Sequence, residues 1–267
     1  MSDNHAYREE LEIAERAATD AGAIIMRWYG RDYRVQEKSK NNPVTTADLE
    51  ANNTIREVIQ NRFPQDGWLS EEDKDTDKRL ACSRVWVVDP IDGTKEFIEG
   101  VPHFAVSVGF VVDGQPTAAV VYNPPEDRLY RAARGQGAYL NGEPIHVTGQ
   151  IEVQGARLLV SRSEPQRKFQ VFVDRCELQR VGSIANRLAK VAAGEGDGTL
   201  TFRSVHEWDV CAGALMVEEA GGRVIDGNGR RLVFNCQETR HRGIVASNEI
   251  LAYRFQELWA RSMAEKQ

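Results

Sequence analysis

The sequence predicts an α/β fold in which two layered subdomains enclose a shared cleft. A β-rich stretch with hairpin signals, about residues 104–140, lies in the first half of the chain. From about residue 156, short apolar runs typical of strands alternate with segments of helical periodicity. No internal repeat or low-complexity linker separates the two halves. We therefore expect an N-terminal α+β subdomain, residues 1–155, packed tightly against a C-terminal α/β subdomain, residues 156–267.

The composition is that of an ordinary globular protein. The chain has 267 residues, of which 41% are hydrophobic and 28% charged, and its net charge of −6 argues against binding a nucleic-acid polymer. No apolar run approaches the ~18 residues of a membrane span, and the first residues lack the features of a secretory signal. The four cysteines are scattered without C-x-x-C spacing, so we predict reduced thiols in a cytoplasmic protein without membrane insertion.

Two helices are predicted ahead of the β-rich stretch. Apolar residues recur at helical spacing from about residue 5 to 29, where Gly30 ends the pattern. They do so again from about 46 to 63, where Pro64 ends it. The segment 38–43 between the helices is polar and turn-rich, so it is predicted to be a loop.

The remaining elements follow in chain order. The run 85–88 is apolar enough for a buried strand, and Asp113-Gly114 is a hairpin turn between strands 104–112 and 117–122. Further strands are expected at 129–130, 138–140, 157–160, 178–181, 199–202, 223–225 and 243–246. Further helices are expected at 166–175, 184–193, 208–220 and the C-terminal end.

The segment Asp89 to Ile98 carries the strongest chemical signal. Asp89 and Asp92 lie three residues apart where the buried strand meets a Pro/Gly turn. Two carboxylates held together are costly unless a cation neutralises them. Gly93-Thr94 then leads into a possible helical turn, whose free backbone N–H groups can hold an anion. The segment therefore predicts a site for metal and phosphate.

Three other acidic segments are candidates for the same site. They carry Asp48, Glu71 with Glu72, and Asp209. Oxygen ligands suit hard ions such as Mg²⁺, and no His/Cys cluster indicates zinc. Each segment alone has a simpler interpretation: a first-turn helix acid, a solvated loop and a helix cap, respectively.

Four motifs resemble the lithium-sensitive, magnesium-dependent phosphatases of the inositol monophosphatase superfamily. They are Val44 to Asp48, Ser70-Glu71-Glu72, Asp89 to Thr94, and Trp208 to Gly213, and the resemblance covers nearly the whole chain. It implies a layered α-β-α-β-α sandwich. Three further segments look more like the bacterial CysQ-type 3′(2′),5′-bisphosphate nucleotidases: Lys95 to Ile98, Val120 to Pro124, and Ser161 to Ser163.

The resemblance implies roles for individual residues. Metal ligands would be Glu71, Asp89, Asp92, Asp209 and the backbone carbonyl of Ile91. Substrate contacts would come from Glu71, Ile91, Asp92, Gly93, Thr94, Ser183 and Asp209, with the backbone N–H groups of Gly93 and Thr94 on the phosphate. Catalytic residues would be Thr94, near the attacking water with Glu71 behind it, and Asp48, which pairs with Glu72 toward a more weakly bound metal. Ser70 departs from the glycine that the family often has there.

The implied activity is hydrolysis of adenosine 3′,5′-bisphosphate to AMP and phosphate, a step of sulfur metabolism. Two to three Mg²⁺ ions would activate the water, and no signature of a covalent phosphoenzyme is evident. The first alternative keeps this chemistry on inositol 1-phosphate or another sugar phosphate. The second is a non-catalytic regulatory protein associated with phosphate or RNA. Dimers occur among related enzymes, so a homodimer is possible.

The residues that select the substrate stay open. Ser183, after Gly182, begins a predicted helix where it would present its hydroxyl to a ribose or a base. Arg162 and Lys95 are candidates for a second phosphate, and Lys38 or Lys40 for reaching into the site. His206 and Glu207 are expected at the pocket rim, and Trp208 is expected to pack and orient Asp209.

Overall fold

The computed structural model describes residues 7–39 and 42–264. Across these residues, no helix combines the length and the apolar character needed to cross a membrane. Lys40, one of the two lysines considered for the site, lies outside the described residues.

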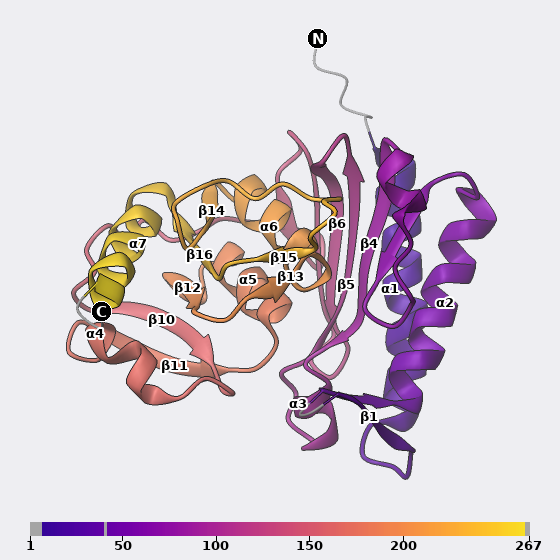
Figure 1. Ribbon diagram of the computed structural model, residues 1–267, viewed down its shortest axis with the longest axis horizontal. Coiled ribbons are helices and arrows are strands. Elements are labelled where there is room, and N and C mark those ends of the chain that lie inside the picture. Colours follow the sequence, from indigo (N-terminus) through magenta and orange to yellow (C-terminus); the bar gives the residue numbers. More distant parts are fainter. Residues whose placement is uncertain (1–6, 40–41, 265–267) are drawn as a thin grey trace.

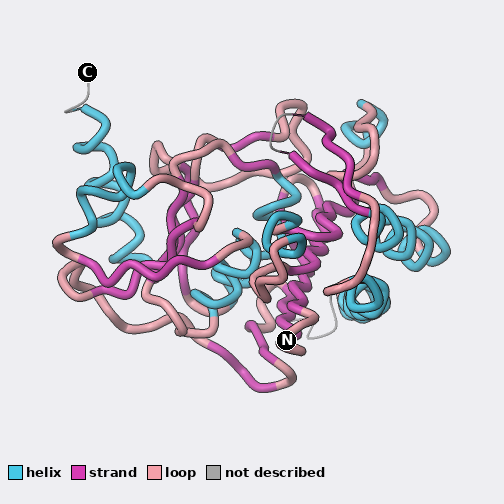
Figure 2. The backbone as a smooth tube through the Cα atoms, turned by 90° about the horizontal axis from the view of Figure 1, so that it is seen from below, coloured by secondary structure: helices cyan, strands magenta, loops and turns pink. Residues whose placement is uncertain are grey.

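The elements form five layers, which confirms the α-β-α-β-α sandwich (Figure 1). Helices α1 (Arg8–Trp28) and α2 (Thr46–Arg62) cover the outer face of a seven-stranded sheet. Helices α5 (Ile184–Ala192) and α6 (Glu207–Glu219) lie between that sheet and a five-stranded one. Helix α7 (Glu249–Ala264) covers the far face of the second sheet, and Figure 2 shows the same alternation of helices and strands from below.

The seven-stranded sheet is antiparallel except at one edge. Its order is β3-β4-β5-β6-β7-β8-β9, and only β3 and β4 run parallel. The strands are β3 Gly67–Ser70, β4 Arg84–Asp92, β5 Ala105–Val112, β6 Gln115–Asn123, β7 Arg128–Ala133, β8 Ala138–Leu140 and β9 Glu143–Ile145. The predicted Asp113-Gly114 hairpin joins β5 and β6, and both turn residues have positive φ, 48° and 76°. The apolar run before Asp89 lies in β4, next to the edge strand β3, and its four residues are fully buried.

The five-stranded sheet has the order β11-β10-β12-β16-β14. Its strands are β10 Ala156–Ser161, β11 Cys176–Val181, β12 Gly198–Thr201, β14 Gly222–Asp226 and β16 Ile244–Asn248. Strand β10 is parallel to both of its neighbours, whereas β16 is antiparallel to both of its own. Each sheet draws on one half of the chain, but the division at residue 155 into two subdomains stays a prediction.

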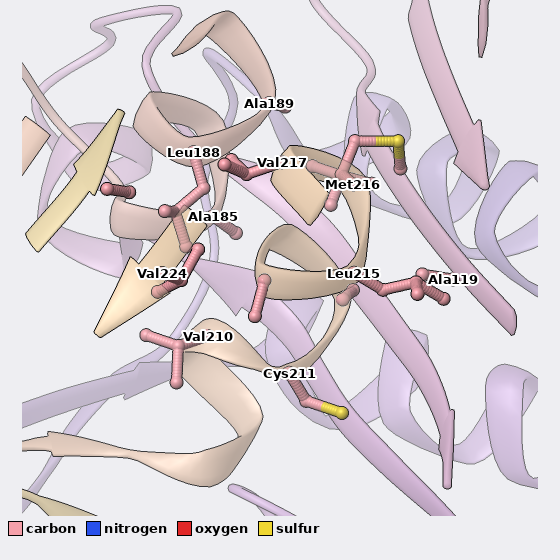
Figure 3. Close-up of a cluster of buried hydrophobic side chains, with 14 of the residues drawn as sticks. Ala119, Ala185, Leu188, Ala189, Val210, Cys211, Leu215, Met216, Val217 and Val224 are labelled. Atoms are coloured by element: carbon pink, nitrogen blue, oxygen red, sulfur yellow. The ribbon is translucent and has the colours of Figure 1, made fainter. Parts of the chain in front are cut away.

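The inner and outer helices differ in how they are buried. Helix α1 buries one stripe, including Ala14, Ala18 and Ile25, as expected for a helix with one solvated face. Helix α6 is buried without a break from Val210 to Val217, because a sheet lies on each side of it (Figure 3). Helix α6 packs closely on β5, since a Cβ at Gly109 of β5 would lie 2.7 Å from the sulfur of Cys211.

Several expectations about local structure were wrong. Of the predicted loop 38–43, the described residues at both ends lie in paired strands, β1 (Val35–Ser39) and β2 (Asn42–Thr45). The first of these strands is exposed along its length and so shows no apolar alternation. The predicted helix 166–175 is a 3₁₀ turn, η2 (Gln166–Phe169), followed by one turn of α-helix, α4 (Gln170–Val173). Five further elements were not predicted: the strands β3 and β9, η1 Asp77–Ala81, β13 Val205–His206 and β15 Arg240–His241.

Candidate active site

The candidate site is a pocket of about 220 Å³ at the carboxyl end of β4. Because β3 and β4 run parallel, with Ser70 beside Val88, the residues that follow both strands meet at one edge. The N–H of Glu71 donates to the carbonyl of Val88 at 3.2 Å, which places Glu71 beside Asp89. The pocket is lined by Asn42, Pro43, Glu71, Asp89, Ile91, Asp92, Gly93, Thr94, Lys95, Glu96 and Asp209.

Three of the predicted metal ligands converge. One carboxylate oxygen from each of Glu71, Asp89 and Asp209 lies within 4.8 Å of the others. Asp89 is only 1% exposed, and burial together with its acidic neighbours raises its pKa well above the usual range. Burial, Asp92 and Glu71 do the same to the pKa of Asp209. Such a group of oxygen ligands fits a hard cation, which would remove the repulsion.

Asp209 is fixed by the start of α6. Its Oδ2 accepts the N–H of His206 at 2.8 Å, so the residue caps its own helix as one of our simpler interpretations had it. The Trp208 ring stacks on His206 with 4.2 Å between centroids, and its carbonyl accepts the hydroxyl of Ser107 at 3.1 Å. Trp208 therefore packs beside Asp209 as predicted, and the capping role and the metal-ligand role are compatible.

Asp92 is not one of the three converging carboxylates, but its charge acts on both Asp89 and Asp209. Its Oδ2 accepts the Ser183 hydroxyl at 2.6 Å and the Ala185 N–H at 2.6 Å, both at the start of α5. Burial raises the pKa of Asp92 to about 6 against the effect of these donors. The Ser183 hydroxyl also accepts the N–H of Asn186, at 3.0 Å. Ser183 therefore holds Asp92, and its contact with a ribose or a base stays a prediction.

The hydroxyl of Thr94 contacts Asp48. It donates to Asp48 Oδ1 at 3.0 Å and lies 3.2 Å from the carbonyl oxygen of Ile91. The other oxygen of Asp48 accepts the Thr45 N–H at 2.8 Å, in a capping box at the start of α2. Burial raises the pKa of Asp48 to about 6. We expected Glu71 behind Thr94, but the packing of α2 against β4 brings Asp48 there.

A lysine bridges the two consecutive glutamates. Lys38 on the β1–β2 hairpin places Nζ 2.8 Å from an oxygen of Glu71 and 2.8 Å from one of Glu72. Burial raises the pKa of Glu72 to about 7 despite this ammonium group. The hairpin that we predicted as a loop therefore supplies positive charge to the acidic site.

The segment after Asp92 begins with an obligatory glycine. Gly93 has φ of 102°, and a Cβ there would lie 3.0 Å from the carbonyl oxygen of His103. Helix α3 (Thr94–Ile98) follows, and Lys95 lines the pocket without an ion pair to any described residue. Glu96 also lines the pocket, and its side chain packs against the segment before α5, where a Cβ at Gly182 would lie 2.4 Å from it.

The remaining candidate for a second phosphate is already paired. Arg162 lies 3.3 Å from Glu96 and 3.0 Å from Glu99, so its charge is balanced by carboxylates of the α3 region. Phe97 of the same helix packs against Tyr33, at 5.0 Å between centroids, and against Phe104. Of the segment that suggested a nucleotide substrate, only Lys95 is therefore an unpaired cation among the described residues.

Glu207 lies in the interior, so the expectation of a place at the pocket rim was wrong. It is 0% exposed and accepts the N–H groups of Asn235 at 2.7 Å and Cys236 at 2.9 Å. Burial raises its pKa to about 7. His206 is half-buried, and burial with Arg240 lowers its pKa to about 4. Glu207 thus fixes the 235–236 turn against the helix that carries Asp209.

Sequence reasoning missed residues behind the pocket. Thr45 holds Asp48, Ala185 holds Asp92, and Arg79, which is 2% exposed, donates to Asn235 Oδ1 at 2.8 Å. Only Thr45 had a readable signal, since a threonine three residues before an aspartate is the spacing of a capping box. The other two act through contacts between distant segments.

The five-layer fold and a carboxylate site at its centre define a class of phosphatases. The chain belongs to the Inositol monophosphatase family, which it matches over residues 6–267. It is 37% identical to "Nus factor SuhB" of Pasteurella multocida over 235 residues, 82% of this chain and 85% of that protein. It is 34% identical to "Inositol monophosphatase 3" of Solanum lycopersicum over 242 residues, covering 86% and 90% of the two.

Solved structures agree with this membership. An IMPase of Thermotoga maritima superposes with a TM-score of 0.87 at 27% identity, covering 96% of this chain and 99% of that one. The extragenic suppressor protein suhB of Bartonella henselae gives a TM-score of 0.85 at 29% identity, over 94% and 98%. The relatives therefore carry two kinds of name, inositol monophosphatase on the one hand and Nus factor or suppressor protein on the other.

Proposed function

We propose that this protein is a Mg²⁺-dependent phosphomonoesterase whose metal ligands are the predicted set. The side chains of Glu71, Asp89, Asp92 and Asp209 and the carbonyl of Ile91 would hold two to three ions. The observation that supports this most directly is the convergence of Glu71, Asp89 and Asp209 within 4.8 Å. Oxygen-only donors at this density favour Mg²⁺ over zinc.

The chain's own residues would supply the acid–base chemistry. Bound Mg²⁺ neutralises phosphate charge and lowers the pKa of coordinated water. Thr94 Oγ1, which donates to Asp48 at 3.0 Å, is placed to accept a proton from the attacking water while its own proton passes to Asp48. A pKa of about 6 leaves Asp48 mostly ionised at neutral pH and suits it to this role. The N–H groups of Gly93 and Thr94 would bind the phosphate.

For the substrate we infer adenosine 3′,5′-bisphosphate, converted to AMP and phosphate. The support is Lys95, a pocket cation without a carboxylate partner in the described part of the chain. A monophosphate held by metal ions and backbone N–H groups has no need of this further charge, whereas a second phosphate does. Arg162 supports the inference less, because Glu96 and Glu99 already balance it.

A second candidate substrate is inositol 1-phosphate, which the similarity to Inositol monophosphatase 3 favours. The relatives called Nus factor SuhB support a third reading, a regulatory protein without catalysis. The complete carboxylate set argues against a purely regulatory role, since clustered buried acids are costly to keep unless they bind a cation.

The test measures phosphate release from adenosine 3′,5′-bisphosphate and from inositol 1-phosphate, with Mg²⁺ and with Mg²⁺ plus Li⁺. We expect a higher kcat/KM for the bisphosphate and inhibition by Li⁺. Lys95→Met should raise KM for the bisphosphate about tenfold, the effect of one exposed charge contact, and leave inositol 1-phosphate nearly unchanged. Lys78→Met, at an exposed lysine on η1, is the control.

Each of the other outcomes contradicts a different part of the proposal. Equal or better turnover of inositol 1-phosphate would overturn the substrate. Hydrolysis of neither ester would overturn the activity and favour the regulatory reading.

A further inference from the structure

Arg187 is a buried charge without a direct counter-ion. It is the fourth residue of α5 and is 3% exposed. Its guanidinium donates to the carbonyl of Ser183 at 3.3 Å, to the hydroxyl of Thr199 at 3.1 Å and to the carbonyl of Leu200 at 3.3 Å. All three acceptors are neutral, and no carboxylate of the described residues lies within ion-pair distance. Burying a cation in this way is costly unless charges further away compensate.

Three carboxylates are close enough to interact with it. Burial lowers the pKa of Arg187 to about 10, and the charges of Asp92, Glu164 and Glu96, in this order, act against that shift. Arg187 therefore stays protonated near neutral pH.

Two of these three carboxylates have cations of their own. Glu164 lies 3.5 Å from the ammonium of Lys168, and Glu96 lies 3.3 Å from the guanidinium of Arg162. Asp92 has only neutral donors, the Ser183 hydroxyl and the Ala185 N–H. Asp92 is thus the carboxylate that depends on Arg187 for compensation.

A single residue connects the two groups. Ser183 gives its hydroxyl to Asp92 and its carbonyl to Arg187 Nε. Its φ is 57°, a left-handed conformation that is unfavourable for serine and persists only where surrounding contacts hold it. Thr199 and Leu200 of β12 anchor the same guanidinium to the second sheet. Arg187 therefore holds the backbone turn that orients Asp92.

We propose that Arg187 is an internal counter-charge that sets the metal affinity of the carboxylate site. In the metal-free protein it stabilises ionised Asp92, and in the metal-bound protein its positive charge opposes the ion. It is a positioning residue, because it acts on Asp92 through Ser183 and through its field. The inference rests on the proposed Mg²⁺ binding. It also implies that the positive charge of Arg187 keeps the affinity for Mg²⁺ moderate.

The test compares Arg187→Gln, which keeps donors but loses the charge, with the wild type. Calorimetric titration measures Mg²⁺ affinity, and thermal unfolding is followed in EDTA and in saturating Mg²⁺. We expect Arg187→Gln to unfold at a lower temperature in EDTA yet to bind Mg²⁺ about threefold to tenfold more tightly. Arg187→Lys, which keeps the charge, should bind Mg²⁺ within about twofold of wild type.

A purely structural role predicts a different pattern. Thr199→Val removes one acceptor and no charge, so it should lower stability and leave Mg²⁺ affinity within about twofold of wild type. Unchanged or weaker Mg²⁺ binding by Arg187→Gln would overturn the proposal.

The experiment also covers a variant that does not fold. In that case Arg187→Gln combined with Asp92→Asn should fold, because no ionised carboxylate is then left uncompensated. Failure of both variants to fold would overturn the counter-charge. If wild-type protein binds no Mg²⁺, the proposed function fails, and the coupling between positions 187 and 92 in EDTA still decides the counter-charge.

Discussion

The strand side and the helix side of the site hold their carboxylates by different means. Glu71 follows β3 and is paired with the ammonium of Lys38 on a hairpin, whereas Asp89 lies within β4 and accepts the N–H of Ile91 at 3.0 Å. Asp92 and Asp209 instead accept hydrogen bonds of 2.6 to 2.8 Å from groups at the starts of α5 and α6. On the strand side, the carboxylates of Glu71 and Asp89 repel each other until a metal ion neutralises them. On the helix side, hydrogen bonds fix the positions from which Asp92 and Asp209 would bind that ion.

Removing a strand-side charge should have the largest effect and separate activity from stability. We expect Asp89→Asn to lose more than about 100-fold in kcat/KM, beyond what loss of an outer-shell partner costs. In EDTA the same variant should unfold at a higher temperature than wild type, because burial and neighbouring acids oppose ionised Asp89. Phosphate release and thermal unfolding check both halves of the prediction. Near-normal Mg²⁺-dependent turnover by Asp89→Asn or by Asp92→Asn would contradict the metal assignment.

The Thr94–Asp48 pair tests whether the strand side also supplies the base. Thr94→Val removes the hydroxyl and should lower kcat about 100-fold with a small change in KM, as loss of general base catalysis does. Thr94→Ser keeps the hydroxyl and should retain most of the activity. Steady-state kinetics on both variants make the comparison. Equal losses in Val and Ser would show that the methyl group, and not the hydroxyl, matters.

Removing a hydrogen-bond donor on the helix side should have a smaller effect than removing a carboxylate. Ser183→Ala removes one of two donors to Asp92 and leaves the Ala185 N–H in place. We expect about a tenfold loss in apparent Mg²⁺ affinity, typical of an outer-shell partner. Ser163→Ala, at an exposed serine, is the matched control. A loss as large as that of Asp89→Asn would remove the distinction between the two sides.

The smallest effect is expected in the pH dependence of thermal stability, which reports the repulsion among the buried carboxylates. The raised pKa values, about 6 for Asp48 and Asp92 and about 7 for Glu72, mean that the folded protein binds protons more tightly than the unfolded chain. The free energy of unfolding of the metal-free protein is then greatest near pH 4 and falls as the pH rises through 7. Each kcal/mol of unfolding free energy that is lost should lower Tm by roughly 2 to 4 °C.

Saturating Mg²⁺ should reverse this trend, because the ion binds the deprotonated carboxylates. Unfolding scans from pH 4.5 to 8, in EDTA and in Mg²⁺, give both curves. Metal-free stability that rises with pH across this range would show that the acids are compensated without metal.

The correct predictions depended on local sequence patterns, namely turn residues, helical periodicity and short motifs. The Asp113-Gly114 hairpin and the helix expected at 208–220 follow from turn chemistry and from the glycines that end the helix, and the structure has both. The motifs located Glu71, Asp89 and Asp209, and the parallel pairing of β3 with β4 explains why the first two meet. The roles of these residues stay predictions until they are measured.

The errors came from contacts between distant segments and from one neglected periodicity. Asp48 replaces Glu71 behind Thr94 because α2 packs on β4, which no local pattern encodes. Glu207 is two residues before Asp209, about 200° around the helix, so helical geometry alone would have placed it on another face. Ser183 turns toward Asp92 because of its left-handed backbone, a conformation that is rare for serine.

The order in which the site is made follows from its division between the halves of the chain. Glu71, Asp89 and Asp92 are synthesised well before the helix starts at Ser183 and His206 that hold Asp92 and Asp209. The N-terminal half is therefore synthesised before the helix starts that donate to Asp92 and Asp209, whereas Lys38, the partner of Glu71, belongs to that half. The ammonium that pairs with Glu71 and Glu72 is thus synthesised ahead of both glutamates.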